Sequence, residues 1–192
     1  MGVRTDYAKR DTLWKYIRTI GRVEYDETRV EHVHPRAEGW MEQLNLRAEG
    51  EPVEKGQLLG SLYSPEILAA QVDFLIAHDQ KRRVEKARNR LRLLGVTEDT
   101  ITRIQQRGKT QNTVPLVAPA SGVITKLNAQ EGMYVKPDME IFTIADLGKI
   151  WVMVDIFEHQ IDWVAEGLSA EITVPAYPGR TWEGTVDYIY PE

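Results

Sequence analysis

Residues 33–62 read VHPRAEGWMEQLNLRAEGEPVEKGQLLGSL, and residues 117–144 read VAPASGVITKLNAQEGMYVKPDMEIFTI. The two stretches share residues in the same order: Pro35 and Pro119, Gly39 and Gly122, Leu44 and Leu127, Glu49 and Glu131, Gly50 and Gly132, and Val53 and Val135. In each copy, short apolar alternations are separated by glycine, which is typical of small antiparallel strands. One copy of about 30 residues cannot bury enough apolar surface alone, so we expect both to form one sandwich.

Two pairs of repeated residues have a mechanical interpretation. Gly50 and Gly132 are expected where the chain turns tightly, because glycine adopts a positive φ without a steric penalty. Val53 and Val135 follow three residues later and should point into the core that the halves share.

Residues 64–115 separate the two copies and are predicted to be helical. Ser64 followed by Pro65 is a strong helix start, with serine as N-cap and proline at the first helical position. One unbroken helix over residues 66–94 would extend about 43 Å at 1.5 Å per residue, and the chain could then barely return to the sandwich. We therefore predict a turn near His78–Lys81 and a bundle of three short helices.

The flanking residues 1–32 and 145–192 contain further short strand patterns and are predicted to form a β-barrel domain. The strands counted there are too few to close a barrel comfortably, so either the barrel is truncated or the N-terminal strands complete it. The predicted fold is thus mainly β: a lipoyl-like β-sandwich (residues 33–63 and 116–144), split by the helical insert (residues 64–115), beside this barrel.

Composition excludes several classes of function. The 192 residues include no cysteine, so disulfides and thiolate chemistry are absent. A net charge of −5 gives no reason to expect nucleic acid. No apolar run approaches the roughly 18 residues that span a bilayer, and the N-terminal residues do not form a signal peptide. If the protein works outside the cytoplasm, we expect its export signal or anchor to lie outside this sequence.

The split sandwich resembles the lipoyl/biotinyl type, whose enzyme carriers present a modified lysine at the turn between the halves. Here residues 64–115 occupy that position, so no lysine matches the modified one and no lipoyl or biotin cofactor is expected. No nucleophile elbow, phosphate loop, HExxH helix or paired-carboxylate arrangement is visible, and we predict no catalytic residues. A lipoyl or biotin carrier remains the least favoured alternative.

Three segments carry a resemblance to a known family: residues 31–65 (EHVHPRAEGWMEQL…KGQLLGSLYSP), 90–104 (RLRLLGVTEDTITRI) and 131–160 (EGMYVKPDMEIFTIADLGKIWVMVDIFEHQ). As a set they resemble periplasmic efflux adaptors, also called membrane fusion proteins, of the heavy-metal branch, which is represented by a copper/silver adaptor. The resemblance covers nearly the whole chain, although the methionine-bearing N-terminal region and the membrane-proximal domain of that family are absent and the helical insert is short.

The resemblance implies a periplasmic protein attached to the inner membrane and belonging to a tripartite heavy-metal cation efflux pump. Its implied partners are an inner-membrane resistance-nodulation-division transporter, an outer-membrane channel, other adaptor copies and the transported metal ions. The alternative is an adaptor of the same plan that serves drugs or other organic substrates. The sequence does not choose between copper or silver and zinc, cobalt or cadmium.

Candidate metal ligands are few. His32 and His34 alternate across Val33, so on one strand they would share a face about 7 Å apart and could ligate one metal ion. The same spacing also arises on any exposed strand, so they are weak candidates. Glu158 and His159 are better explained as a solvated helix face. The methionines Met41, Met133, Met139 and Met153 are scattered and are expected to fill the core or pack at edges.

The most lopsided charge feature is a basic run: Lys81, Arg82, Arg83, Lys86, Arg88, Arg90 and Arg92. Neither aromatic interleaving nor a basic domain accompanies it, so nucleic acid is not the expected partner. Two interpretations remain: a solvated helix face, or docking to a partner in the assembly through Lys81, Arg82 and Arg83. Four tryptophans are expected to pack in the sandwich and barrel rather than to form a ligand platform: Trp40, Trp151, Trp163 and Trp182.

Overall fold

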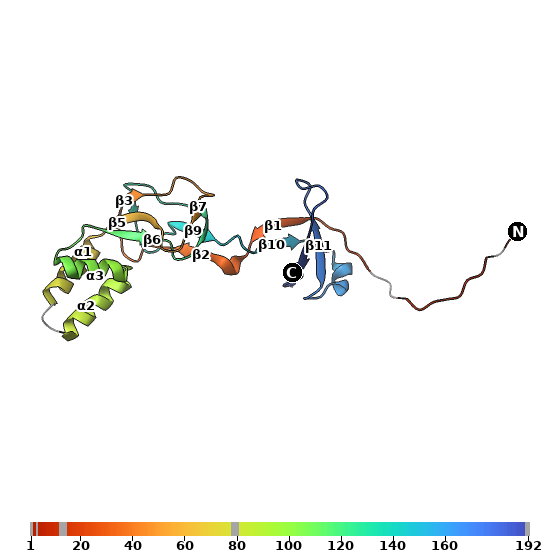
Figure 1. Ribbon diagram of the computed structural model, residues 1–192, viewed down its shortest axis with the longest axis horizontal. Helices are drawn as coiled ribbons and strands as arrows, with labels where there is room; N and C mark the ends of the chain where they lie inside the picture. Colours follow the sequence, from red (N-terminus) through yellow and green to blue (C-terminus); the bar gives the residue numbers. More distant parts are fainter. Residues whose placement is uncertain (1, 3, 12–14, 78–80, 191–192) are drawn as a thin grey trace. The chain divides into compact units, whose positions relative to one another are not determined.

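The computed structural model describes residues 2, 4–11, 15–77 and 81–190, except for the side chain of Lys81. The chain forms two compact units, one of residues 24–151 and one of residues 1–23 together with 152–192 (Figure 1).

The larger unit contains the predicted sandwich. The first half supplies β2 (Val30–Val33), β3 (Gly39–Leu44), β4 (Pro52–Val53) and β5 (Leu58–Tyr63). The second half supplies β6 (Thr113–Val117), β7 (Gly122–Leu127), β8 (Tyr134–Val135) and β9 (Phe142–Ala145). Two four-stranded sheets result, with strand orders β2-β9-β7-β4 and β6-β5-β3-β8. Each sheet therefore takes two strands from each half.

The short strands β4 and β8 are exchanged between the halves. Val53 of β4 lies opposite Gly122 of β7, and Val135 of β8 lies opposite Gly39 of β3. Both valines are buried, with 3% and 0% of their surface exposed, which confirms the prediction for them. A β-carbon at Gly39 would lie 2.0 Å from the carbonyl oxygen of Tyr63, so β3 and β5 approach more closely than any side chain allows.

Hydrogen bonds between the halves are also reciprocal. The carboxylate of Glu49 accepts from the backbone N–H of Leu127 at 3.1 Å, and that of Glu131 accepts from the N–H of Leu44 at 3.0 Å. The adjacent Gly50 and Gly132 have φ of +89° and +77°, as predicted for tight turns. The two halves are therefore related by an approximate twofold symmetry that includes side-chain contacts.

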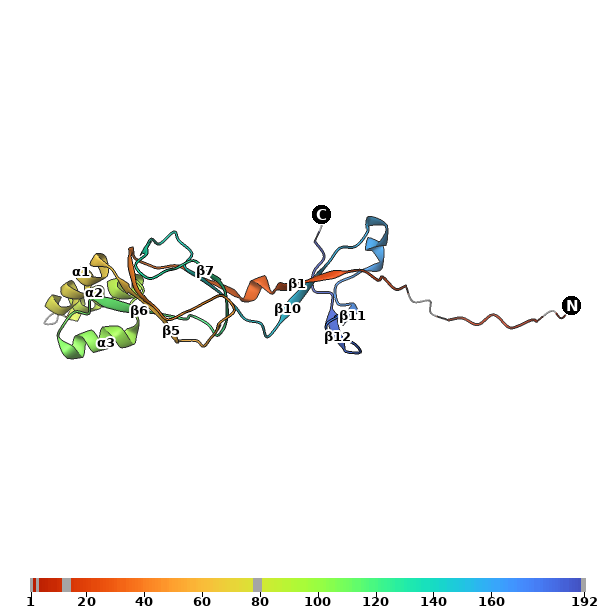
Figure 2. The same cartoon turned by 90° about the horizontal axis from the view of Figure 1, so that it is seen from above.

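Three helices lie together at one end of the sandwich, between β5 and β6 (Figures 1 and 2). They are α1 (Pro65–Ile76), α2 (Lys81–Leu93) and α3 (Glu98–Arg107), which confirms the predicted three-helix insert. The Ser64 hydroxyl caps α1 by accepting from the N–H of Ile67 at 3.4 Å. Residues 78–80 of the predicted turn lie outside the described residues, and Lys81 begins α2.

The bundle is held by a small apolar core and one buried amide. Its most buried apolar side chains are Ile67, Phe74, Leu91, Ile101 and Ile104. Gln71, which is 1% exposed, donates to the carbonyl of Gln111 at 3.0 Å and accepts from the Gln111 N–H at 2.7 Å. These bonds fasten α1 to the segment that leads into β6.

Strands β2 and β6 extend the sandwich beyond its predicted bounds. β2 begins at Val30, three residues before the expected sandwich boundary, because it pairs with β9 from Val30 opposite Ala145. β6 likewise begins at Thr113, opposite Tyr63 of β5, inside the range expected to be helical. The two strands have the sequences VEHV and TVPLV, which differ too much to be recognised as parts of the repeat.

Two short sheets lie outside the sandwich, and the second of them belongs to the smaller unit. β1 (Gly21–Tyr25) pairs with β10 (Ile150–Val154), and β11 (Ser169–Thr173) pairs antiparallel with β12 (Thr181–Thr185). The segment expected to be helical before β11 is the 3₁₀ helix η3 (Glu158–Trp163). Among its described side chains none is fully buried, in contrast to the sandwich. In the part of the chain that the structure covers, no helix combines the length and apolarity needed to cross a bilayer.

Candidate functional site

Helix α2 carries the basic run, and the arginines of its C-terminal half pair with carboxylates of the insert. Arg90 Nη1 lies 3.0 Å from Asp73 Oδ2 of α1, and Arg88 Nε lies 3.3 Å from Glu98 Oε2 of α3. Arg92 also binds Glu98, and its guanidinium holds the pKa of that carboxyl below its ordinary value. These three arginines therefore attach α2 to the helices on either side of it.

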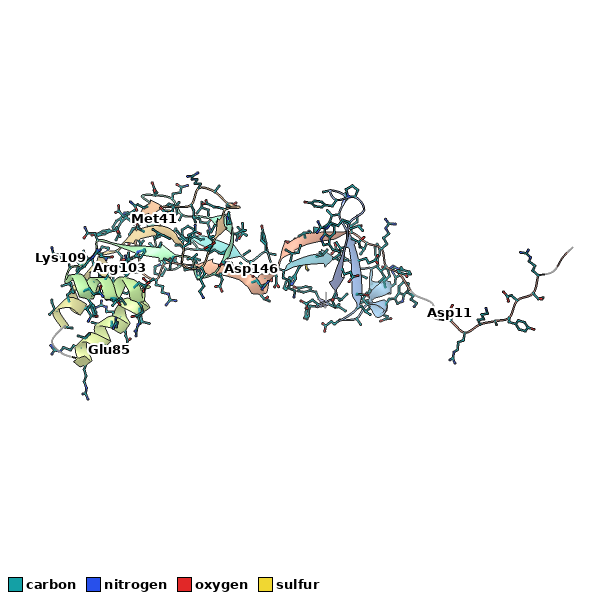
Figure 3. All side chains as sticks on the ribbon, viewed as in Figure 1. Asp11, Met41, Glu85, Arg103, Lys109 and Asp146 are labelled. Carbon is teal, nitrogen blue, oxygen red and sulfur yellow. The ribbon has the colours of Figure 1, made fainter. Side chains whose placement is uncertain are left out.

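The N-terminal half of α2 is different. Arg82, Arg83 and Lys86 are exposed, and within the described residues none of them has a hydrogen bond or ion pair. We call these three side chains the basic surface; Figure 3 labels Glu85, which lies between them in sequence. The first turn of α2 contains no acidic residue. Cations at this positive end of the helix dipole destabilise a helix, by typically about 0.3–1 kcal/mol each. Their placement therefore does not serve the stability of the helix.

The three predicted contact residues have different outcomes. Arg82 and Arg83 lie together at the exposed start of α2, whereas the side chain of Lys81 is outside the described part of the structure. Contact between these residues and a partner remains a prediction, which the absence of internal partners favours.

His32 does not point freely into solvent. Its Nδ1 lies 3.2 Å from Oε2 of Glu140, and Lys126 Nζ lies 4.0 Å from Oε1 of the same carboxylate. The hydroxyl of Thr143 also donates to Glu140 and is the main cause of a lowered pKa of that carboxyl. His32 is therefore one member of a four-residue polar cluster on the outer face of the sheet β2-β9-β7-β4.

His34 does not join this cluster through the strand, because β2 ends at Val33. Among the residues with described positions, no three His, Cys, Asp or Glu side chains are arranged to hold a metal ion. Metal ligation by His32 and His34 therefore stays a prediction. In the smaller unit, the ring of His159 stacks on Phe157 with a centroid distance of 5.8 Å.

The expectation that the tryptophans pack internally is wrong for Trp163, which is 39% exposed, and for Trp40. The alternation of β3 places Met41, labelled in Figure 3, in the core with 0% exposure, so its neighbour Trp40 faces outward and is 42% exposed. Trp40 packs against Tyr134 edge to face at a centroid distance of 4.7 Å, and against Tyr63 at 6.0 Å. We call these three side chains the aromatic patch.

Comparison with known proteins identifies the chain. The family model described as CusB, barrel-sandwich hybrid domain, matches residues 30–145, which is more than half of the sequence. The chain belongs to this CusB family. A second model, described as CusB-like, beta-barrel domain, matches residues 149–192.

Two relatives of this CusB-family chain have names that describe cation efflux or metal resistance. It is 31% identical to the cation efflux system protein CusB of Escherichia coli (strain K12), over 94% of this chain and 45% of CusB. It is 26% identical to the cobalt-zinc-cadmium resistance protein CzcB of Cupriavidus metallidurans, over 88% of this chain and 37% of CzcB. The chain thus spans less than half the length of these relatives.

Solved structures confirm the fold of the CusB-family chain. ZneB from Cupriavidus metallidurans superposes with a TM-score of 0.58 at 22% identity, over 88% of this chain and 81% of ZneB. A MacA–MexA chimeric protein superposes with a TM-score of 0.56 at 19% identity, over 90% of this chain and 66% of the chimera. The expected sandwich with a helical insert is confirmed.

The aromatic patch of this CusB-family sandwich was missed from the sequence, although a signal was present. Aligning the repeat through Gly39 and Gly122 places Trp40 opposite Val123. An alternating strand pattern with glycine and methionine on one face puts tryptophan on the other. An aromatic residue on the face that the core does not use was therefore readable before the structure.

Proposed function

We propose that this chain is the sandwich, helical and barrel-like part of a periplasmic adaptor in a tripartite heavy-metal cation efflux pump. In this role it links an inner-membrane resistance-nodulation-division transporter to an outer-membrane channel and associates with further adaptor copies. The supporting observation is the family match over residues 30–145, together with 31% identity to CusB over 94% of the chain.

In this proposal the protein contributes surfaces rather than chemistry. Neither a catalytic residue nor a covalently bound cofactor takes part, and the helices occupy the connection where lipoyl and biotinyl carriers present a lysine. The full-length adaptor is held at the inner membrane and works in the periplasm. Metal ions are the cargo of the pump.

The helical insert contributes one of these surfaces. The basic surface lies in the first two turns of α2, and its three side chains have no partner within the described residues. Arg82 and Arg83 lie in the first turn, where positive charge weakens the helix. An acidic surface on the channel or on a neighbouring adaptor would neutralise these charges. The electrostatic stabilisation gained on assembly accounts for the presence of these cations at the start of α2.

The test is a resistance assay in a strain that lacks the adaptor gene. The full-length protein should restore growth on metal salts, and a panel of copper, silver, zinc, cobalt and cadmium identifies the cargo. Restored resistance to organic drugs but to no metal would refute the metal assignment. Restored resistance to neither would refute the adaptor role for a correctly localised protein.

The role of the basic surface is tested by reversing charge at Lys81, Arg82 and Arg83. We expect lower metal resistance without loss of thermal stability, since exposed charges each contribute about 0–1 kcal/mol and acidic residues are favourable at the start of a helix. A matched control reverses three exposed cations on sandwich loops: Arg47, Lys55 and Lys136. Unchanged resistance in the α2 variant would mean that this helix face is only solvated.

A further inference from the structure

The aromatic patch lies where the sandwich meets the helices. Trp40 is paired with Tyr63 across β3 and β5, and with Tyr134 across β3 and β8. Tyr63 immediately precedes Ser64, the cap of α1. Trp40 and Tyr134 are 42% and 37% exposed, so much of this aromatic surface faces water.

A carboxylate borders the patch. Tyr134 hydrogen-bonds to Glu38, and this bond raises the pKa of the Tyr134 hydroxyl. Glu38 is exposed and lies two residues before Trp40 on the same outward side of the chain. The patch therefore combines aromatic faces, which carry negative charge density, with a full negative charge at its edge.

The related sheet has no such surface. The approximate twofold symmetry places Val123 where Trp40 lies, Pro52 where Tyr134 lies and Ala145 where Tyr63 lies. The core positions beside them are apolar in both halves. Packing of the sandwich therefore does not require aromatic residues at these positions.

Two other tryptophans, Trp163 and Trp182, each have a cation of this chain over the ring. Lys15 Nζ lies 4.4 Å from the ring centre of Trp163, and the guanidinium carbon of Arg180 lies 4.8 Å from that of Trp182. Trp40 is more exposed than either of these rings. Across residues 15–77 and 81–190, it has no cation from its own chain above it.

We propose that the aromatic patch and Glu38 bind an arginine or lysine side chain presented by a protein partner. The cation lies against the Trp40 face and pairs with the Glu38 carboxylate. Arginine suits the site better than lysine, because its planar guanidinium stacks on an aromatic ring while still donating to a carboxylate. This goes beyond the adaptor role, since it names the chemistry of the partner and does not depend on the transported substrate.

A peptide titration tests the proposal on the whole chain at low salt. The probe is a capped pentapeptide, Gly-Arg-Gly-Arg-Gly, and the control probe replaces both arginines by citrulline, which is uncharged and nearly isosteric. Binding is followed by the indole N–H resonance of Trp40 in NMR spectra, assigned with the Trp40→Phe variant. We expect a shift that saturates with the arginine peptide and is much smaller with the citrulline peptide.

Variants then locate the site. Glu38→Gln should weaken binding about two- to fivefold, as expected for loss of an exposed ion pair. Trp40→Leu should weaken it by a similar factor, in line with about 0.5–1 kcal/mol for an exposed cation–π contact. Because Trp40→Leu lacks the indole resonance, the affinities of all variants are compared by titration calorimetry. Val123→Ala, at the position related to Trp40, should leave binding unchanged. Equal binding of both peptides, or equal affinity for the wild type and Glu38→Gln, would overturn the proposal. If Trp40→Leu does not fold, Glu38→Gln still decides it, and neither result depends on metal resistance.

Discussion

The two halves of the sandwich agree in the interior and differ on the outside. In the interior, Gly39 and Gly122 allow equally close strand contacts, and Val53 and Val135 fill related places in the core. On the outer faces, almost nothing corresponds. One sheet carries the aromatic patch, and the other carries the cluster around Glu140.

The cluster makes the difference explicit. His32, Lys126, Glu140 and Thr143 interact on one sheet, and their related positions on the other are Pro115, Gln43, Leu58 and Ser61, none of them charged. The exchanged strands and the shared core constrain the inner positions, because a destabilising substitution at one of them affects the packing of both halves. The outer positions have no such constraint and are free to differ for binding.

The largest effect should come from a charge at either core valine. Val53→Asp and Val135→Asp each bury an unpaired carboxylate, which should cost at least about 3 kcal/mol and abolish cooperative folding. Urea denaturation followed by circular dichroism measures this, with Val72→Asp at a 43% exposed helix position as control. A folded protein from one of the two variants would break the equivalence of the halves.

The paired glycines should follow. Gly39→Ala and Gly122→Ala place a methyl group 2.0 Å and 2.4 Å from a carbonyl oxygen of the neighbouring strand, so about 1–3 kcal/mol of unfolding free energy should be lost in each. Gly50→Ala meets no neighbouring atom but must adopt a φ of +89°, and should cost about 1–2 kcal/mol. Chemical denaturation of all three variants separates close contact from backbone strain.

The reciprocal carboxylates should have smaller and equal effects. Glu49→Ala leaves the N–H of Leu127 without its carboxylate acceptor, and Glu131→Ala does the same to Leu44. Each should cost about 0.5–1.5 kcal/mol, since water replaces part of the bond at these exposed sites. If only one variant loses stability, the twofold relation does not extend to side chains.

The smallest effect concerns pH and only one sheet. The folded pKa of Glu140 lies below its ordinary value of 4.5, mainly because of the Thr143 hydroxyl. The unfolded state therefore binds more protons, so this contribution to stability is complete above about pH 4.5 and is lost as the pH falls through the folded pKa. Glu140→Gln should reduce the acid sensitivity of the unfolding free energy, whereas Leu58→Gln, at the related position, should leave it unchanged.

The repeat and the helix start at Ser64 were readable from the sequence because both depend on local rules: alternation, glycine turns and capping. The position of β2 could not be predicted, because its sequence VEHV does not resemble TVPLV, the sequence of the related strand β6. Only part of the candidate site could be predicted from the sequence. The excess charge of α2 could be counted, but the pairing of Arg88 and Arg92 with Glu98 depends on how α3 packs. The bond between His32 and Glu140 likewise joins residues 108 positions apart.

The path of the chain through the sandwich has a mechanical consequence. The chain enters at β2 and leaves at β9, which are neighbours in one sheet, whereas both connections to the helices, β5 and β6, are neighbours in the other. If the helices are pulled in one direction and the two ends of the chain in the other, the force acts on the sheet of β5 and β6 at one side and on the sheet of β2 and β9 at the other. The load passes between them through the exchanged strands β4 and β8 and through the links that lead to them.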